Sequence, residues 1–233
     1  DILAVLYGRV MHHDSTNPQM PERDRFVLSK SHACPGLYAV LAESGYFPVK
    51  ELSTFRGIES RLQGHAHIKT PGVERSGGSL GQGLSFGVGV ALAARLDSRR
   101  TRTYVLLGDG ECDEGQIWEA AMSASHHGLD NLVAIVDRNR IQNDRWTHEV
   151  MSLEPFADKW KSFGWHSMEV DGHSVDELLS AFHTAEQTKG RPSVIIANTL
   201  KGKGVSFMEN NVDFHGKAPS PEELSKALEE LGE

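Results

Sequence analysis

The order of apolar and polar positions divides the chain into alternating strands and helices. Short apolar runs without polar alternation, typical of strands buried on both faces, predict strands at 26–29, 103–109, 132–137, 165–171 and 192–200. Apolar residues at helical spacing predict helices at 1–13, 35–47, 84–96, 116–127, 174–187 and 221–231. Because the crossovers are long enough to hold helices, we expect an α/β fold, a parallel sheet sandwiched by helices, with residues 1–233 forming a single domain.

Charge and composition exclude several classes of partner. The net charge of −8 gives no attraction to nucleic acid or to an anionic membrane, and no apolar run approaches the length of a membrane span. The first residues lack the basic start and cleavage site of a signal peptide. The only two cysteines, Cys34 and Cys112, lie far apart, which fits a reducing cytoplasm and gives no metal-ligand spacing.

A carboxylate between two glycines follows one of the predicted strands. The segment 103–109 runs into Gly108-Asp109-Gly110, and the strand 132–137 is followed by Asn139. The carboxyl ends of neighbouring parallel strands meet at one edge of a sheet, where ligands bind. Carboxylate and amide oxygens suit Mg²⁺ or Ca²⁺, and Gly110 lets a backbone N–H approach a phosphate closely.

Two other interpretations of this segment are open from the residues alone. Gly-Asp-Gly is also an ordinary tight turn. The pair of strands could belong to a dinucleotide-binding unit, although no G-x-G-x-x-G follows either strand.

Several longer segments resemble transketolase, over nearly the whole chain. They are DRFVLSKSHACPGLYAVLAESGYF, GGSLGQGLS, LLGDGECDEGQIWEAAM, VDRNRIQ, EVDGHS and LKGKGVSFMENNVDFHGKAP. The length is similar to that of the N-terminal, diphosphate-binding subunit of split transketolases. The resemblance implies the thiamine diphosphate-binding (PP-type) fold, with thiamine diphosphate and Mg²⁺ or Ca²⁺ as cofactors.

The resemblance also implies roles for individual residues. The metal ligands are the side chains of Asp109 and Asn139 and the backbone carbonyl of Ile141. The implied catalytic histidines around the thiazolium and the sugar carbonyl are His32, His65 and His215. The other implied cofactor-binding residues are Gly108, Gly110 and Lys201 at the diphosphate, Gly78 and Leu80 at the aminopyrimidine ring, and Glu114 in a network between subunits.

Taken singly, most of these residues have plainer interpretations. Each histidine is an ordinary surface or hydrogen-bonded residue, Lys201 is a solvated loop lysine, and Leu80 anchors a loop. Glu111 and Asp113 are interpreted only as acids that complement the dipole of the helix after them. The remaining histidines noted in the sequence are interpreted as surface residues: His12, His13, His126 and His127.

The chain departs from the family pattern at a few positions. Ala66 and His67 replace a common proline and acid, and we assign His67 no role. Ser31 and Arg140 stand where glycine is common, and the Arg140 side chain is expected to point into solvent.

The resemblance implies transfer of a two-carbon ketol unit from a ketose phosphate to an aldose phosphate. The glutamate that activates the cofactor lies in a pyrimidine-binding domain in this family, and no second α/β domain follows residue 200. We therefore expect a C-terminal partner subunit in an α₂β₂ assembly, a chain that is inert alone, and an N-terminal segment missing before residue 1. The residues do not determine whether the sugars belong to the pentose phosphate pathway or to another route.

Two alternatives are weighed against transketolase. One is a subunit of another thiamine enzyme, of the 2-oxoacid dehydrogenase or deoxyxylulose phosphate synthase type. The other is a non-catalytic subunit that keeps the fold, against which the intact Asp109 and Asn139 argue.

Overall fold

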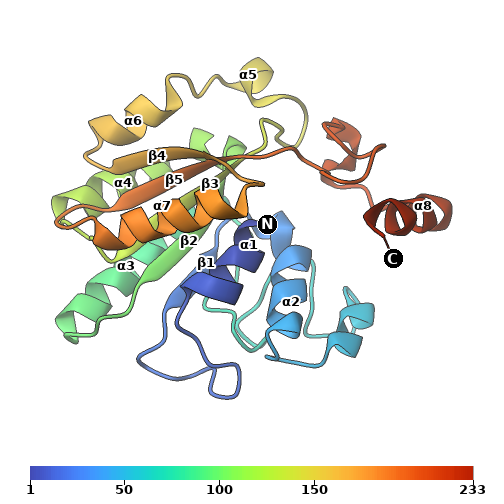
Figure 1. Cartoon of the computed structure of the whole chain (residues 1–233), viewed down its shortest axis with the longest axis horizontal. Helices are drawn as coiled ribbons and strands as arrows, with labels where there is room; N and C mark the ends of the chain where they lie inside the picture. The colour runs from blue at the N-terminus through green and yellow to red at the C-terminus, as the bar shows by residue number, and fades with distance from the viewer. Residues whose placement is uncertain (233) are drawn as a thin grey trace.

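The fold is a five-stranded sheet covered by helices on both faces, in a computed structural model that describes residues 1–232 (Figure 1). The strands are β1 (Arg25–Leu28), β2 (Thr103–Gly108), β3 (Leu132–Arg138), β4 (His166–Asp171) and β5 (Ser193–Asn198). Their order is β1-β2-β3-β5-β4, and every neighbouring pair is parallel. The predicted fold class is therefore confirmed.

The helices form two layers, one on each face of the sheet. One layer contains α1 (Ile2–Val5), α2 (Cys34–Glu43) and α7 (Val175–Gln187), and the other contains α3 (Gln82–Leu96), α4 (Gly115–His126) and α6 (Phe156–Ser162). The short α5 (Thr147–Val150) follows β3, and α8 (Pro221–Leu231) lies away from the sheet near the C-terminus (Figure 1). The remaining short helical turns are η1 (Leu6–Val10), η2 (Ser31–Ala33), η3 (Val49–Thr54), η4 (Gly110–Asp113) and η5 (Val212–His215).

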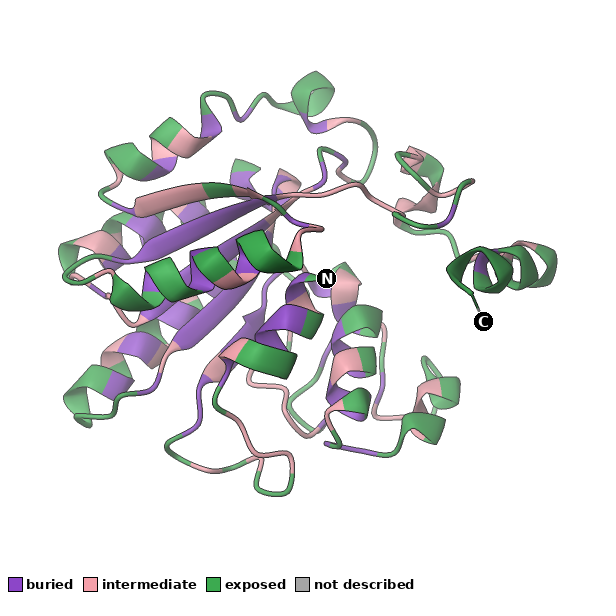
Figure 2. Cartoon of the chain, viewed as in Figure 1, coloured by how far each residue is buried: buried purple, intermediate pink, exposed green. Residues whose placement is uncertain are grey.

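The central strands are buried on both faces, which explains their uninterrupted apolar runs (Figure 2). On β3, Val133 and Ile135 pack into the core under α2 and α7, whereas Ala134 and Val136 pack into the core under α3 and α4. The small residues of α3 allow a close approach to the sheet, because a Cβ on Gly87 would lie 2.5 Å from the side chain of Val105.

Most predicted elements are present, with corrections at a few places. The segment 1–13 is not one regular helix, because α1 passes into the π-helical turn η1 and the backbone becomes extended at Met11. The predictions missed α6, whose aromatic residues Phe156 and Trp160 are packed into the core. No helix of residues 1–232 has both the length and the apolar character needed to cross a membrane.

Candidate functional site

The carboxyl ends of β1, β2, β3 and β5 surround a cavity of about 460 Å³. Glycine-rich and polar segments follow these strands, as a ligand site at this edge requires. The predicted site residues that line the cavity are His32, Gly78, Leu80, Gly108, Asp109, Gly110, Asn139, Ile141, Lys201 and His215. His65 and Glu114 are not among its lining residues.

Asp109 begins the turn η4 and is held by two backbone donors. Its Oδ1 accepts from the N–H of Gly110 at 2.8 Å, and its Oδ2 accepts from the N–H of Arg140 at 2.6 Å. The carboxylate is only 2% exposed, and burial raises its pKa to about 6 despite these hydrogen bonds. A nearby cation would stabilise the ionised form of such a buried carboxylate.

Asn139 lies in the segment after β3, directly before the residue whose N–H donates to Asp109. The Oδ1 atom of Asn139 accepts from the N–H of Ile141 at 3.0 Å, which orients this oxygen. Asp109 Oδ2 and Asn139 Oδ1 are thus both tied to the segment 139–141.

Two lysines bring positive charge to the cavity. The Nζ atom of Lys30 lies 2.5 Å from Oδ2 of Asp137, and Thr199 donates its hydroxyl to the other carboxylate oxygen. Lys201 also lines the cavity, and its pKa is lowered by burial and by the neighbouring charge of Lys30. These cations suit an anionic ligand.

The three predicted catalytic histidines form one cluster, although they come from distant segments. The ring centroid of His32 lies 5.6 Å from that of His65 and 5.6 Å from that of His215. Nδ1 of His32 is 3.4 Å from Nε2 of His215. The pKa of His215 is lowered to about 4 by burial and by the charges of Lys201, His32 and Lys30, so its imidazole is neutral near pH 7.

Glu111 is not an exposed acid of the following helix, and its interpretation as one was wrong. Its side chain is 3% exposed and accepts from the hydroxyl of Ser29 and from the N–H groups of Gly81 (2.9 Å) and Gly108 (3.1 Å). Burial raises the pKa of Glu111. No sequence pattern indicated this, because its partners Ser29 and Gly81 are far away in the chain.

His13, interpreted as a surface residue, is partly exposed and makes specific contacts. Its Nε2 atom lies 2.9 Å from the carbonyl oxygen of Tyr7, and its ring stacks on Tyr46. The other histidines in that group, His12, His126 and His127, are exposed, and so are Asp113 and Glu114.

The departures from the family pattern have local explanations. Arg140 has φ of 64°, a left-handed conformation that glycine adopts at no steric cost, and its side chain is exposed as expected. Ser31 is buried, and a Cβ on Gly77 would lie 2.5 Å from its Oγ. His67 is exposed and only accepts from the N–H of Lys69.

The sequence reasoning missed several residues of the cavity region besides Glu111. Lys30 and Asp137 form its ion pair, and Gln142 lines it with a buried Oε1 atom that lacks a hydrogen-bond partner in the described chain. The signal available for Asp137 was its position at the end of a buried strand, two residues before Asn139.

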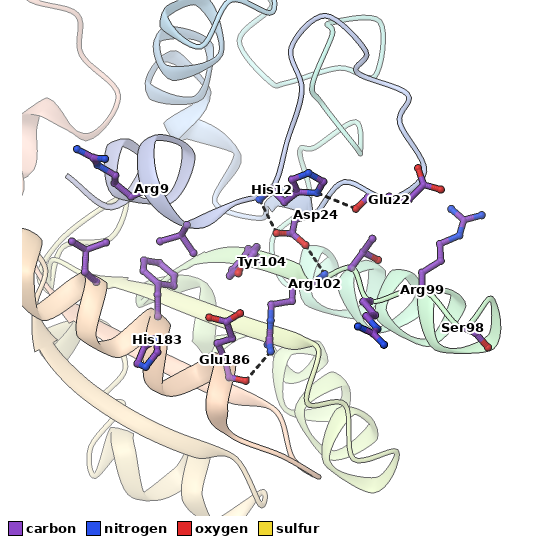
Figure 3. A pocket seen from close by; sticks show the side chains of 15 residues that line it. Arg9, His12, Glu22, Asp24, Ser98, Arg99, Arg102, Tyr104, His183 and Glu186 are labelled. Atoms are coloured by element: carbon purple, nitrogen blue, oxygen red, sulfur yellow. Dashed lines mark hydrogen bonds between the residues drawn. The ribbon is translucent and has the colours of Figure 1, made fainter.

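A larger cavity of about 800 Å³ lies elsewhere, beside the residues that begin β1 and β2 (Figure 3). There Arg102 donates to the carbonyl oxygens of Asp130 and Glu186, and the Asp24 carboxylate accepts from the N–H of Arg102. Glu186 lies in the last turn of α7, so Arg102 compensates the negative end of that helix dipole. Among residues 1–232, no group of three or more His, Cys, Asp and Glu side chains could hold a metal here or elsewhere.

A parallel sheet covered on both faces, with a polar cavity at its carboxyl edge, defines an α/β cofactor-binding domain. The model of the family "Transketolase, thiamine diphosphate binding domain" matches residues 1–233. The chain belongs to the transketolase family and carries its thiamine diphosphate-binding domain.

The relatives include both separate subunits and longer chains. The 6-deoxy-6-sulfo-D-fructose transketolase subunit SqwG of a Clostridium species is 47% identical, over 99% of this chain and 84% of the relative. An apulose-4-phosphate transketolase subunit of Phocaeicola vulgatus is 42% identical, over 100% of this chain and 83% of the relative. Human transketolase is 43% identical over 98% of this chain, which spans only 36% of the human protein.

Solved structures give the same fold. Transketolase from Leishmania mexicana superposes with a TM-score of 0.93 at 34% identity, and the match covers 99% of this chain and 36% of that one. Transketolase from Campylobacter jejuni gives 0.93 at 33% identity, covering 99% and 37%. This chain therefore spans about a third of those enzymes.

Proposed function

We propose that this chain is the diphosphate- and metal-binding subunit of a split transketolase, which transfers a two-carbon ketol unit between sugar phosphates. The observation that carries the proposal is that side-chain oxygens of Asp109 and Asn139 both accept from the backbone of residues 140–141, in a cavity that two lysines and two histidines also line. Neither a tight turn nor a non-catalytic scaffold requires this combination of groups.

The proposed metal ligands have the chemistry that Mg²⁺ or Ca²⁺ prefers. Each carboxylate oxygen of Asp109 accepts one backbone hydrogen bond and keeps a further lone pair, and Asn139 offers an oriented amide oxygen. The carbonyl group of Ile141 belongs to the same turn, and the apolar side chain of Ile141 is buried. The ionised form of Asp109, which burial disfavours, would be stabilised by the cation.

The proposed diphosphate position lies between the metal ligands and the two lysines. Gly110 lines this part of the cavity, and Lys201 and Lys30 supply positive charge. The Asp137 carboxylate offsets one of the two lysine charges through the ion pair with Lys30. The site is therefore positively charged, but Asp137 compensates part of that charge. Such a site suits an anionic ligand whose own charge is partly neutralised by a metal.

The aminopyrimidine ring is proposed to lie against the loop that contains Gly78 and Leu80. The Leu80 side chain is 47% exposed, so it has apolar surface left for a planar ring. When bound, thiamine diphosphate supplies the electron sink that allows a carbon–carbon bond next to a carbonyl to be broken.

The histidines are proposed to orient the sugar and to move protons at its oxygens. A neutral His215 can accept a proton from a sugar hydroxyl, and His32, 3.4 Å away, can receive a hydrogen bond from it or donate one to it. His65 stacks on His32 and restricts its rotation.

We propose that a separate C-terminal subunit completes the enzyme, in an α₂β₂ assembly. Two of the relatives are named as subunits, and the match covers 84% and 83% of their length. Human transketolase, in contrast, is nearly three times as long as the part that matches this chain. Both free cysteines are buried, which is compatible with the proposed cytoplasmic location.

The substrate class is proposed to be ketoses with an anionic terminal group. The names of two relatives contain apulose 4-phosphate and 6-deoxy-6-sulfo-D-fructose, a phosphate and a sulfonate. Both groups are anionic, so ketoses that carry a terminal phosphate or sulfonate are the compounds to test as substrates.

The test begins with co-purification of the chain and its partner from native lysate. The complex should bind thiamine diphosphate in a metal-dependent way and transfer a two-carbon unit from at least one ketose phosphate or sulfonate. Turnover of a 2-oxoacid without any sugar activity would contradict the proposal, and so would a complex that binds no thiamine diphosphate.

A further inference from the structure

We propose that Glu111 is a positioning residue that holds the aminopyrimidine loop in its binding shape before the cofactor arrives. This inference rests on the proposed function, because the loop 78–81 matters only if it contacts the cofactor ring. The residue lies in η4, yet its carboxylate contacts three other parts of the chain.

The helix α3 starts without a cap of its own. Its N-cap residue is Gly81, which has φ of 80° and no side chain to accept the first N–H groups of the helix. Oε1 of Glu111 accepts from the Gly81 N–H at 2.9 Å, and Oγ of Ser29 accepts from the Gly83 N–H at 3.2 Å. Ser29 in turn donates its hydroxyl to Glu111.

The Glu111–Ser29 pair therefore reproduces a capping box with residues far away in sequence. Both side chains are buried, at 3% and 0% exposed. In the described residues, Glu111 forms no ion pair within 4 Å, so its charge is compensated by N–H groups and by the positive end of α3. The sequence interpretation attributed this acid to α4, whereas the helix that it stabilises is α3.

The same pair anchors one end of the aminopyrimidine loop. At the other end, the N–H of Gly77 donates to the carbonyl of Ala66 at 2.9 Å. Within residues 1–232, residues 78–80 form no hydrogen bond to another segment of the chain, and these three residues are exposed. The conformation of the loop therefore depends on its two anchors, and Glu111 is the anchor next to Leu80.

Glu111 also connects this loop to the diphosphate side of the cavity. Its Oε2 accepts from the N–H of Gly108 at 3.1 Å, directly before the proposed metal ligand Asp109. One buried carboxylate thus sets the distance between the proposed ring position and the proposed diphosphate position. A ligand that contains both parts should depend on Glu111 more than a ligand that contains only the diphosphate.

The experiment compares thiamine diphosphate with inorganic diphosphate, each in excess Mg²⁺, by titration calorimetry on the purified complex. Glu111→Ala should weaken binding of thiamine diphosphate at least tenfold more than binding of inorganic diphosphate. Glu111→Gln keeps the volume and should show the same preference with a smaller loss. Glu59→Ala, which removes an exposed glutamate outside the cavity, is the control and should change neither affinity.

Amide hydrogen exchange on the chain without cofactor gives an independent measurement. In Glu111→Ala, exchange at the Gly81 and Gly83 amides, which donate to Glu111 and Ser29, should accelerate at least tenfold, while the buried strand β3 keeps its protection. Equal losses for both ligands would mean general destabilisation and would overturn the proposal, as would unchanged exchange at these two amides. If the wild-type complex bound neither ligand, the proposed function would fail, and hydrogen exchange would still decide whether Glu111 orders the loop.

Discussion

The ammonium group of Lys30 lies 2.5 Å from the carboxylate of Asp137, beside the cavity at the carboxyl edge of the sheet. Asp137 also accepts a hydrogen bond from the hydroxyl of Thr199, and it lies two residues before the proposed metal ligand Asn139. Both side chains are mostly buried, at 19% and 23% exposed. Loss of one partner should therefore affect both stability and the site.

Replacement of Lys30 by methionine leaves the Asp137 carboxylate without the cation of its ion pair. The free energy of unfolding should therefore fall by roughly 1–3 kcal/mol, which lies between the contributions of exposed and of fully buried ion pairs. Urea unfolding of Lys30→Met, Asp137→Asn and the double variant measures this. The double variant should lose less than the sum of the single variants, and strict additivity would mean that the pair contributes no coupling.

Acid should destabilise the chain through the same carboxylate. Burial alone would raise the pKa of Asp137, but Lys30 and the hydrogen bonds hold this pKa below its ordinary value. A depressed pKa means that the unfolded chain binds more protons, so the stabilisation is complete above about pH 4 and is lost as the pH falls through the folded pKa. Urea midpoints between about pH 2 and 5 should show this loss in the wild type and a smaller one in Asp137→Asn.

His215 should titrate well below an ordinary histidine. Its pKa of about 4 results from burial and from the nearby charges of Lys201, His32 and Lys30. Between about pH 4 and 6.5 the unfolded chain binds the extra proton, so this histidine costs stability as the pH falls through that range. Proton NMR of the imidazole should give the low pKa, and Lys201→Met should raise it. A pKa near 6.5 in the wild type would contradict the buried, cationic environment.

Much of the fold followed from local patterns, because buried parallel strands produce uninterrupted apolar runs and the carboxyl ends of those strands must share one edge. These patterns alone placed Asp109 and Asn139 correctly at the cavity. The role of Glu111 could not be predicted in this way. Its partners Ser29 and Gly81 lie 82 and 30 residues away, and only tertiary packing brings them together.

The histidine cluster illustrates the same limit. Each of His32, His65 and His215 is an ordinary surface histidine by local criteria, and the resemblance alone suggested that they belong together. Their contacts, a stacked pair of His32 and His65 and an edge-on pair of His32 and His215, arise because three segments far apart in the chain meet there. The ion pair of Lys30 and Asp137 was missed because residues 107 positions apart leave no periodic signal.

Replacement of Asp109 by asparagine should abolish metal-dependent cofactor binding while keeping the side-chain volume. An amide oxygen is a weaker ligand than a carboxylate, and the amide N–H₂ would face the N–H of Gly110 or Arg140, which leaves donors unsatisfied. We expect the affinity for thiamine diphosphate in Mg²⁺ to fall on the order of 100-fold or more, because loss of even an outer partner of a metal ligand costs about 10–100-fold. Titration calorimetry measures this, with Asp158→Asn on the exposed face of α6 as the matched control.

Gly110 should not tolerate even one added methyl group. A Cβ at this position would lie 2.6 Å from the Cβ of Gln142, so Gly110→Ala must displace the segment 139–142 that carries the proposed metal ligands. Overpacking of this kind costs about 1–3 kcal/mol, and here it should also weaken binding of thiamine diphosphate. Gly115→Ala is the matched control, because no atom lies within 4 Å of its added Cβ.

A second-site variant tests the steric explanation directly. Since the conflict is between two Cβ atoms, Gln142→Gly in the Gly110→Ala background should restore affinity and Gln142→Ala should not. If both second-site variants restored it equally, the steric explanation would be wrong.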